Sequence, residues 1–159
     1  MVEAGRKERR RTILAVNPPE IAVKIKKLRP DAKIPVKATA ESACYDVYPL
    51  EETVIAPRGS VILGTGLAVE LPRGYELQIR PRSGYAFKHD VVAYWGTLDS
   101  DYTDEIKVKL FNFGNEPKKI SKDKAIAQVC VKPVYEAVFI ETGELRAKGH
   151  GGFGSTDRT

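Results

Sequence analysis

The sequence of 159 residues has few cysteines and no long apolar run. Its two cysteines, Cys44 and Cys130, fall in apolar, strand-like segments and lack the paired spacing of metal ligands. We therefore expect two buried thiols in an intracellular protein. The sequence shows no secretory signal pattern and no apolar run near the length of a membrane span. These absences predict a soluble protein of the cytoplasm or nucleus that makes no membrane contact.

Helical periodicity is also missing. No window places apolar residues at i, i+3, i+4 and i+7, and 13 glycines and ten prolines interrupt the chain too often for long helices. Short apolar or alternating segments recur instead between turn signals, for example at 21–28, 43–48 and 75–79. The length suits one domain with a real core. The pattern predicts an all-β sandwich or barrel, and the spacing of its segments suits a meander or jelly roll.

The net charge of +5 is distributed unevenly. Five arginines and lysines cluster between residues 6 and 11, ahead of two consecutive prolines. Such a block is typical of a flexible, solvated arm; a nuclear address or a contact with nucleic acid is the alternative. We expect a basic N-terminal arm at 1–20, a β domain at 21–142 and a mobile glycine-rich arm at 143–159.

An acidic stretch at 96–105 stands out in this basic chain. Four carboxylates fall within its last seven residues, and a glycine opens it. Strand-like segments at 91–95 and 106–110 flank it, so it is predicted to be the turn of a β-hairpin. Acidic turns are usually just solvated. A carboxylate here can also act as a general base or anchor a hydrated metal ion, and either role needs companions elsewhere in the chain.

Candidate companions occur in four other places. Asp46 is a carboxylate among apolar neighbours, which is costly to bury unless it is paired or turned toward water or a cation. The run 81–84, Pro-Arg-Ser-Gly, is either an ordinary turn or a phosphate cradle. Gln128 is the one amide in an apolar strand and either satisfies a core hydrogen bond or faces a pocket. The glycine-rich run 148–156 is either a floppy tail or a lid that closes on phosphates and a base.

Taken together, these five stretches in this order resemble the trimeric dUTPase family, the dUTP diphosphatases, over about residues 21–156. The resemblance rests on 43–46, 81–84, 96–102, 125–128 and the glycine-rich tail. It implies a jelly-roll or distorted β-barrel subunit, a homotrimer with active sites at subunit interfaces, and a C-terminal arm exchanged between subunits. It also implies hydrolysis of dUTP to dUMP and diphosphate with Mg²⁺, which keeps uracil out of DNA.

The resemblance also implies roles for single residues. Asp99 matches the catalytic carboxylate, which deprotonates the attacking water. Tyr102 matches the ring that lies under the deoxyribose and rejects ribonucleotides. Asp46 would bind the hydrated Mg²⁺ through water.

The remaining implied roles concern the triphosphate and the base. The phosphates would be held by Arg82, Ser83, Gly84 and Gln128, and by the tail residues Lys148, Gly152, Gly154, Ser155 and Thr156. Phe153 would stack on uracil. The backbone of 91–96, which includes Val92, Trp95 and Gly96, would read the base.

Two alternatives remain open on the sequence. A dCTP deaminase shares the fold implied by the resemblance, but it needs a glutamate on the strand after the acidic turn, and 106–110 has none. A non-catalytic binding or signalling protein is the other alternative. Tyr94 and Trp95 suggest it, since the family usually has two small residues there, and so does Lys148, which replaces an arginine.

Overall fold

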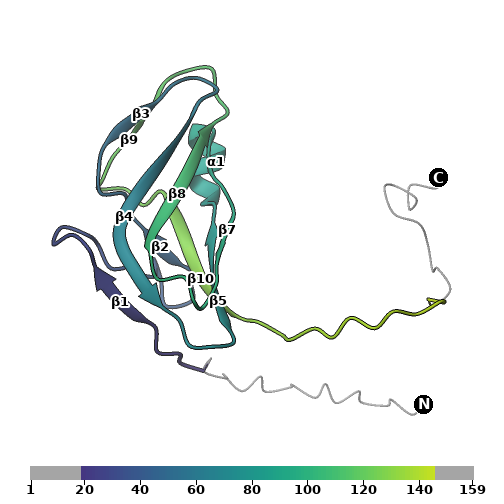
Figure 1. The fold of residues 1–159 in the computed structure, drawn as a ribbon. Helices are drawn as coiled ribbons and strands as arrows, with labels where there is room; N and C mark the ends of the chain where they lie inside the picture. The colour runs from purple at the N-terminus through teal and green to yellow at the C-terminus, as the bar shows by residue number, and fades with distance from the viewer. Residues whose placement is uncertain (1–18, 146–159) are drawn as a thin grey trace, which may run out of the picture.

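The chain, described for residues 19–145 in a computed structural model, is built from antiparallel β-sheets (Figure 1). One four-stranded sheet has the order β1-β4-β8-β6, a second has the order β2-β10-β5-β7, and β3 pairs with β9. This architecture confirms the predicted all-β jelly-roll class. The elements in chain order are β1 Lys24–Lys27, β2 Tyr45–Val47, β3 Thr53–Ile55, β4 Ser60–Glu70, β5 Tyr75–Arg80, α1 Ser83–His89, β6 Val91–Ala93, β7 Gly96–Leu98, β8 Glu105–Asn112, β9 Lys118–Ile120 and β10 Ala127–Pro133.

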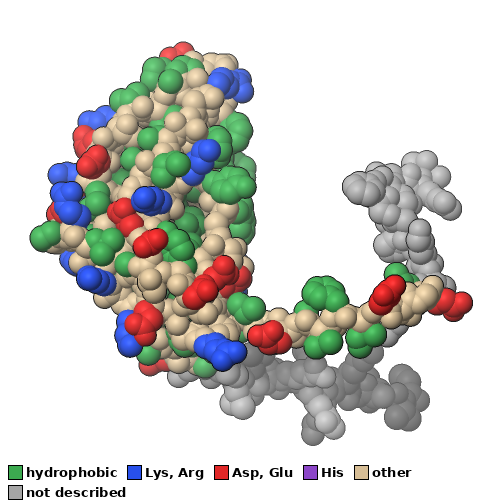
Figure 2. All heavy atoms as spheres, in the orientation of Figure 1, with side chains coloured by type: hydrophobic (Ala, Val, Ile, Leu, Met, Phe, Trp, Pro, Cys, Tyr) green, Lys and Arg blue, Asp and Glu red, His purple; other side chains and the backbone are tan. Residues whose placement is uncertain are grey.

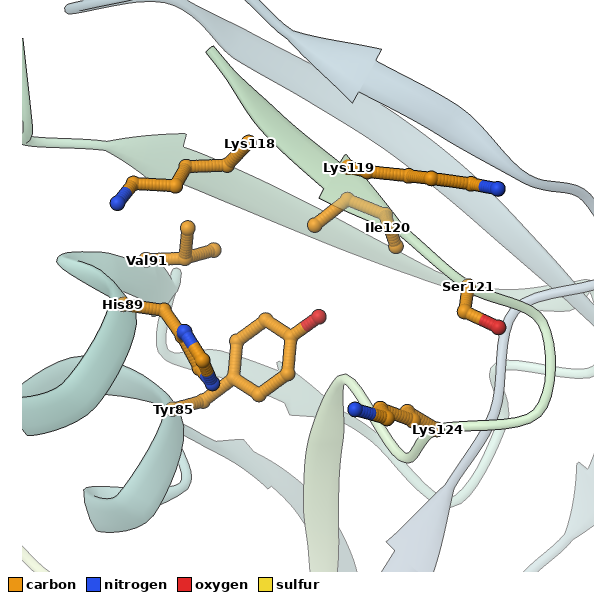
Figure 3. A pocket seen from close by; sticks show the side chains of 8 residues that line it. All are labelled: Tyr85, His89, Val91, Lys118, Lys119, Ile120, Ser121 and Lys124. Atoms are coloured by element: carbon orange, nitrogen blue, oxygen red, sulfur yellow. The ribbon is translucent and has the colours of Figure 1, made fainter. Parts of the chain in front are cut away.

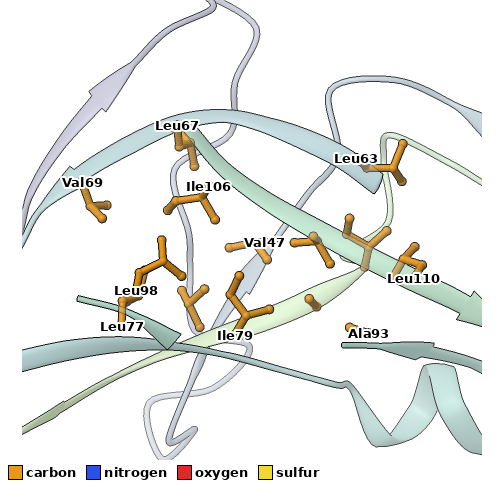
Figure 4. Close-up of a cluster of buried hydrophobic side chains, with 14 of the residues drawn as sticks. Val47, Leu63, Leu67, Val69, Leu77, Ile79, Ala93, Leu98, Ile106 and Leu110 are labelled. Carbon is orange, nitrogen blue, oxygen red and sulfur yellow. The ribbon is translucent and has the colours of Figure 1, made fainter. Parts of the chain in front are cut away.

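Strand β8 shows how sequence alternation produces the core. Ile106, Val108 and Leu110 are buried, whereas Lys107 and Lys109 between them are exposed, because successive side chains of a strand point to opposite faces. The buried side chains meet those of the other sheet, as Figure 4 shows for the residues around Val47 and Ile79. The predicted strand after the acidic turn is therefore confirmed, and its apolar face is what joins the two sheets.

One buried polar side chain, Asn112, fixes the corner where β8 ends. Its Nδ2 donates to the carbonyls of Ala56 at 3.0 Å and Glu116 at 2.8 Å, and its Oδ1 accepts from the amide of Gly114 at 3.0 Å. Because a buried amide without partners is costly, these bonds hold the ends of β3 and β8 in one arrangement.

The helix α1 was not expected from the sequence, where 81–84 is either an ordinary turn or a phosphate cradle and no helix is predicted. It begins directly after Arg82, lacks a side-chain cap, and ends at Asp90 in the left-handed conformation, with φ 55°. Pro81 precedes it, and Gly84 stands in its first turn. Proline and glycine are poor helix formers, so the sequence gives no indication of a helix here. The helix is stabilised by half-buried Tyr85, which packs against the core.

After β10, the described segment 134–145 runs away from the two sheets (Figure 1). It carries exposed apolar side chains, including Val138 at 84% and Phe139 at 95% of their full exposure. Acidic residues are interspersed with them (Figure 2). Such an apolar strip in water is typical of a segment that packs on another surface.

Candidate active site

The strand register brings three polar residues into one row across the sheet. Gln128 on β10 lies opposite Asp46 on β2 and, on its other side, opposite Arg80 on β5. Directly opposed residues of antiparallel strands point to the same face. Residues distant in the sequence therefore share one face of this sheet, at the end where β5 leads into α1.

Arg82 and Asp46 form a two-pronged ion pair at this end. The Arg82 Nε lies 3.1 Å from Asp46 Oδ1, and its Nη2 donates to Asp46 Oδ2 at 3.3 Å. The Arg82 Nη1 also donates to the carbonyl of Ala125 at 2.8 Å. The Asp46 side chain retains only 15% of its exposure and that of Arg82 33%. The guanidinium is thus held in a fixed orientation, with N–H groups left for an anion.

Gln128 is half-buried beside this pair. Its Nε2 donates to the carbonyl of Pro81 at 3.0 Å, which joins β10 to the segment that carries Arg82. This bond is the satisfied hydrogen bond that the sequence allowed as one alternative. A primary amide has a second N–H, so Gln128 is also able to donate to a ligand.

Ser83 and Gly84 lie exposed in the first turn of α1. The first amides of a helix have no partner within it and are free to bind an anion. A Cβ built on Gly84 would meet no atom within 4 Å, so the space beside this backbone is open to a ligand.

A hollow of about 370 Å³ opens beside these residues. Its lining includes Asp46, Arg82 and Gly84, with Lys88 and Lys124 adding positive charge. Asp123 also lines it, and the Lys33 ammonium 3.0 Å away lowers the pKa of this carboxyl, first by a hydrogen bond and then by its charge.

A second hollow of about 300 Å³ lies between α1 and β9 (Figure 3). Tyr85 and His89 line both hollows, and their rings pack edge to face at 5.3 Å. Burial raises the pKa of Tyr85, and the charge of Arg82 partly opposes the rise. The hollow beside Asp46 and Arg82 combines the oriented N–H groups of Arg82 with a net positive charge, which suits a phosphate chain.

Asp99 and Tyr102 lie at the other end of the same sheet. They form a turn in which the Tyr102 amide donates to the Asp99 carbonyl at 3.0 Å, and the Tyr102 hydroxyl donates to the Glu105 carbonyl at 2.9 Å. Leu98 pairs with Leu77, which places Asp99 beside the first residues of β5. With a rise of about 3.3 Å per residue, roughly 13 Å separates this end of β5 from Arg80. Arg82 lies two residues farther along, so one chain does not bring Asp99 to Arg82.

The predicted hairpin around the acidic stretch is confirmed in part. β6 pairs with β8, with Val91 opposite Asn112, so the flanking strands do meet. Between them, β7 leaves this sheet and pairs with β5 in the other. A Cβ on Gly96 would lie 3.2 Å from Ile79 Cδ1, so glycine permits the close approach that this crossing requires. The acidic turn is therefore shorter than predicted.

Arg80, which the sequence did not single out, contacts the ring of Trp95. The Arg80 guanidinium carbon lies 5.3 Å from the centroid of the Trp95 ring, and Arg80 Nε donates to Gln78 Oε1 at 3.1 Å. The neighbouring Tyr94 contacts the other sheet, where its ring centroid lies 6.2 Å from that of Phe111 on β8. The signal for Arg80 was the alternation of polar residues along β5, where Glu76, Gln78 and Arg80 share a face.

Several predicted site residues lie outside the described residues: Lys148, Gly152, Phe153, Gly154, Ser155 and Thr156.

Within residues 19–145, no group of three or more histidine, cysteine, aspartate or glutamate side chains is arranged to hold a metal ion. Asp46 is the carboxylate that lies beside Arg82 at the hollow suited to phosphate. Its two oxygens offer about four lone-pair positions. It is therefore able to accept both Arg82 and a metal-bound water, which fits a hydrated Mg²⁺.

The described part of the chain contains one helix, and its seven residues are too few to cross a membrane.

Comparisons with known proteins extend this picture. The family model described as dUTPase matches residues 30–157. The chain is 49% identical over 140 residues to the deoxyuridine 5'-triphosphate nucleotidohydrolase of Nautilia profundicola, covering 86% of this chain and 99% of the relative. It is 44% identical over 138 residues to the enzyme of the same name from Clostridioides difficile, covering 84% and 96%.

Solved structures share the fold at lower identity. A dUTPase of Staphylococcus bacteriophage 80alpha, determined with dUpNHpp, matches with TM-score 0.77 and 23% identity, covering 85% of this chain and 98% of that chain. The dUTPase of phage phi11 of S. aureus, described with a structural Mg(II) ion, matches with TM-score 0.73 and 19% identity, covering 79% and 99%. These likenesses establish the arrangement of the strands.

Proposed function

The chain belongs to the dUTPase family, and on that premise we propose that it hydrolyses dUTP to dUMP and diphosphate, which limits the incorporation of uracil into DNA. The observation that carries the proposal is that Asp46 and Arg82, from two separate segments, line one hollow, while Gln128 of a third segment lies opposite Asp46 and binds the carbonyl of Pro81. A fixed guanidinium fork beside free helical amides suits the oxygens of a triphosphate.

The active site is assembled from several copies of the chain in a homotrimer. Asp99 and Tyr102 lie at one end of the sheet that carries Gln128, whereas Arg82 lies at the other end. Reacting groups must lie within a few ångströms of one another. A second copy that brings its Asp99 to the Arg82 of the first satisfies this requirement. The segment 134–145, with its exposed apolar side chains, is the part of the chain suited to cross between subunits.

Hydrolysis begins with the water held by Asp99. The exposed carboxylate accepts a proton from this water, whose oxygen then forms a bond to the α-phosphorus of dUTP. The bond from that phosphorus to the bridging oxygen breaks, and diphosphate leaves with the electron pair. Tyr102 packs under the deoxyribose and leaves no room for a 2′-hydroxyl.

Arg82, Ser83, Gly84 and Gln128 bind the phosphate oxygens as negative charge builds on them. Their positions are fixed before the substrate arrives, because Arg82 is anchored on Asp46 and Ala125, and Gln128 on Pro81. Mg²⁺, when bound, neutralises part of the triphosphate charge. Asp46 would hold it through a water molecule.

The base is read by the segment that crosses between the sheets. The backbone groups near Val92, Trp95 and Gly96 offer donors and acceptors that imitate a pairing base, and a close wall at C5 of the ring excludes the methyl group of thymine. The tail residues Lys148, Gly152, Gly154, Ser155 and Thr156 would close over the phosphates, and Phe153 would stack on uracil.

The test is diphosphate release from dUTP, dTTP, dCTP and UTP with Mg²⁺ present. We expect dUTP to exceed each of the others by about a hundredfold or more in kcat/KM. Equal rates on dUTP and dTTP would contradict the base-recognition proposal. Release of ammonia from dCTP would identify a deaminase, and tight binding of dUTP without turnover would identify a binding protein.

A further inference from the structure

Cys44 directly precedes β2, and Cys130 lies on the neighbouring strand β10. The pairs Gln128 with Asp46 and Val129 with Tyr45 fix the register, and one further step, just beyond the first residue of β2, would bring Cys44 opposite Cys130. Directly opposed residues point to the same face. The Cys130 Sγ donates to the carbonyl of Ala43 at 3.3 Å, which holds this thiol against the segment that leads to Cys44.

Continuation of the register would give this pair a spacing that suits a disulfide. Opposed residues of antiparallel strands have Cα atoms about 4.5 or 5.5 Å apart, and disulfides span about 4.4–6.8 Å. Both types of antiparallel pair fall within that range. Cys44 retains 9% and Cys130 4% of their exposure, so the pair is shielded from large reagents, and the oxidant that suits it is one as small as hydrogen peroxide.

Arg80 lies on the same face of this sheet as Cys130. Strand β5 pairs with β10 so that Gln78 lies opposite Cys130 and Arg80 opposite Gln128. Arg80 is itself held by Gln78 and the Trp95 ring. A fixed cation is thus located two positions along the sheet from the Cys130 position.

We propose that Cys44 and Cys130 are a redox-sensitive pair that closes to an intramolecular cross-strand disulfide when the protein meets a hydroperoxide. One thiolate attacks a peroxide oxygen and becomes a sulfenic acid, releasing water after proton transfer. The second thiol displaces the sulfenic hydroxyl as water and forms the S–S bond. In total, two thiols are oxidised and one hydrogen peroxide is reduced to two waters.

The disulfide would lie next to the row formed by Asp46, Gln128 and Arg80. Asp46 is two residues from Cys44, and Gln128 is two residues from Cys130, on the same face of the sheet. Both the dithiol and the disulfide are uncharged, so closure leaves the Asp46–Arg82 ion pair intact. It joins two segments far apart in the sequence, which restricts the unfolded chain. We expect Tm to rise by about 10 °C. We expect kcat at 25 °C to change less than twofold.

The test treats the full-length protein with hydrogen peroxide, quenches with catalase and counts free thiols after denaturation. The expected result is loss of both thiols, a mass lower by two hydrogens at the linked peptides, no covalent oligomer, and the higher Tm, all reversed by dithiothreitol. Cys44→Ala and Cys130→Ala each retain one thiol, and neither should show the rise in Tm. Two alkylatable thiols after treatment, disulfides between chains, or a sulfinic acid in place of the bond would overturn the proposal. None of these readouts depends on turnover of dUTP.

Discussion

Asp46 and Arg82 are joined by a two-pronged ion pair, at 3.1 and 3.3 Å, that connects β2 to the start of α1. The pair uses both carboxylate oxygens of Asp46 and leaves part of the guanidinium facing the hollow. The same contact therefore fixes the fold locally and orients the cation that would meet the triphosphate.

Removing the carboxylate leaves a half-buried guanidinium without its anion. We expect Asp46→Ala to lower the free energy of unfolding by about 1–3 kcal/mol, measured by urea denaturation. Glu70→Ala is the matched control, because the Lys24–Glu70 pair is exposed and contributes less than about 1 kcal/mol. Equal losses for the two variants would show that burial of the Asp46–Arg82 pair adds no stability.

The proposed general base is Asp99. We expect Asp99→Asn to reduce kcat by about a hundredfold to ten-thousandfold, because asparagine cannot accept the proton of the attacking water. Tm should be nearly unchanged, since this side chain is exposed. Asp104→Asn, on the same loop and also exposed, is the control and should retain nearly full activity. Comparable losses in both variants would assign the effect to the charge of the turn.

Sharing of the site between subunits can be tested by mixing two inactive variants. Asp99→Asn removes the carboxylate at one end of the sheet, and Arg82→Ala removes the guanidinium at the other end. When the two are unfolded and refolded together, about one quarter of the sites in a random trimer combine an intact Asp99 with an intact Arg82 from a neighbour. We expect activity to recover to that fraction, measured as diphosphate release. No recovery, with mixed trimers shown by mass spectrometry, would mean that both residues act within one chain.

We propose that the Tyr102 ring discriminates against ribonucleotides. We expect Tyr102→Ala to raise the kcat/KM ratio of UTP to dUTP by about tenfold or more. Tyr102→Phe keeps the ring and loses the hydroxyl bond to the Glu105 carbonyl, so its ratio should stay near that of the unaltered protein. An increase in Tyr102→Phe as large as in Tyr102→Ala would show that the hydroxyl, through the shape of the turn, sets the selectivity.

Much of the fold followed from local pattern in the sequence. The alternation of Ile106, Val108 and Leu110 with lysines predicted β8 and its buried face, because a strand repeats every two residues. The helix α1 was not predicted from the sequence. It is short, begins after a proline and carries a glycine, and its stability comes from packing of Tyr85 rather than from helix propensity.

The sequence alone determined which chemical groups are available, namely Asp46, Arg82, Gln128, Asp99 and Tyr102, since the order of the motifs identifies them without coordinates. Only the tertiary structure decided which of them meet. Strand register joins Asp46 to Gln128, 82 positions apart, and is set by the packing of whole sheets, which no local pattern records. That register unites Asp46 with Gln128 and Arg80 and places Asp99 at the far end of the sheet, and the ion pair with Asp46 then brings Arg82 to the same place.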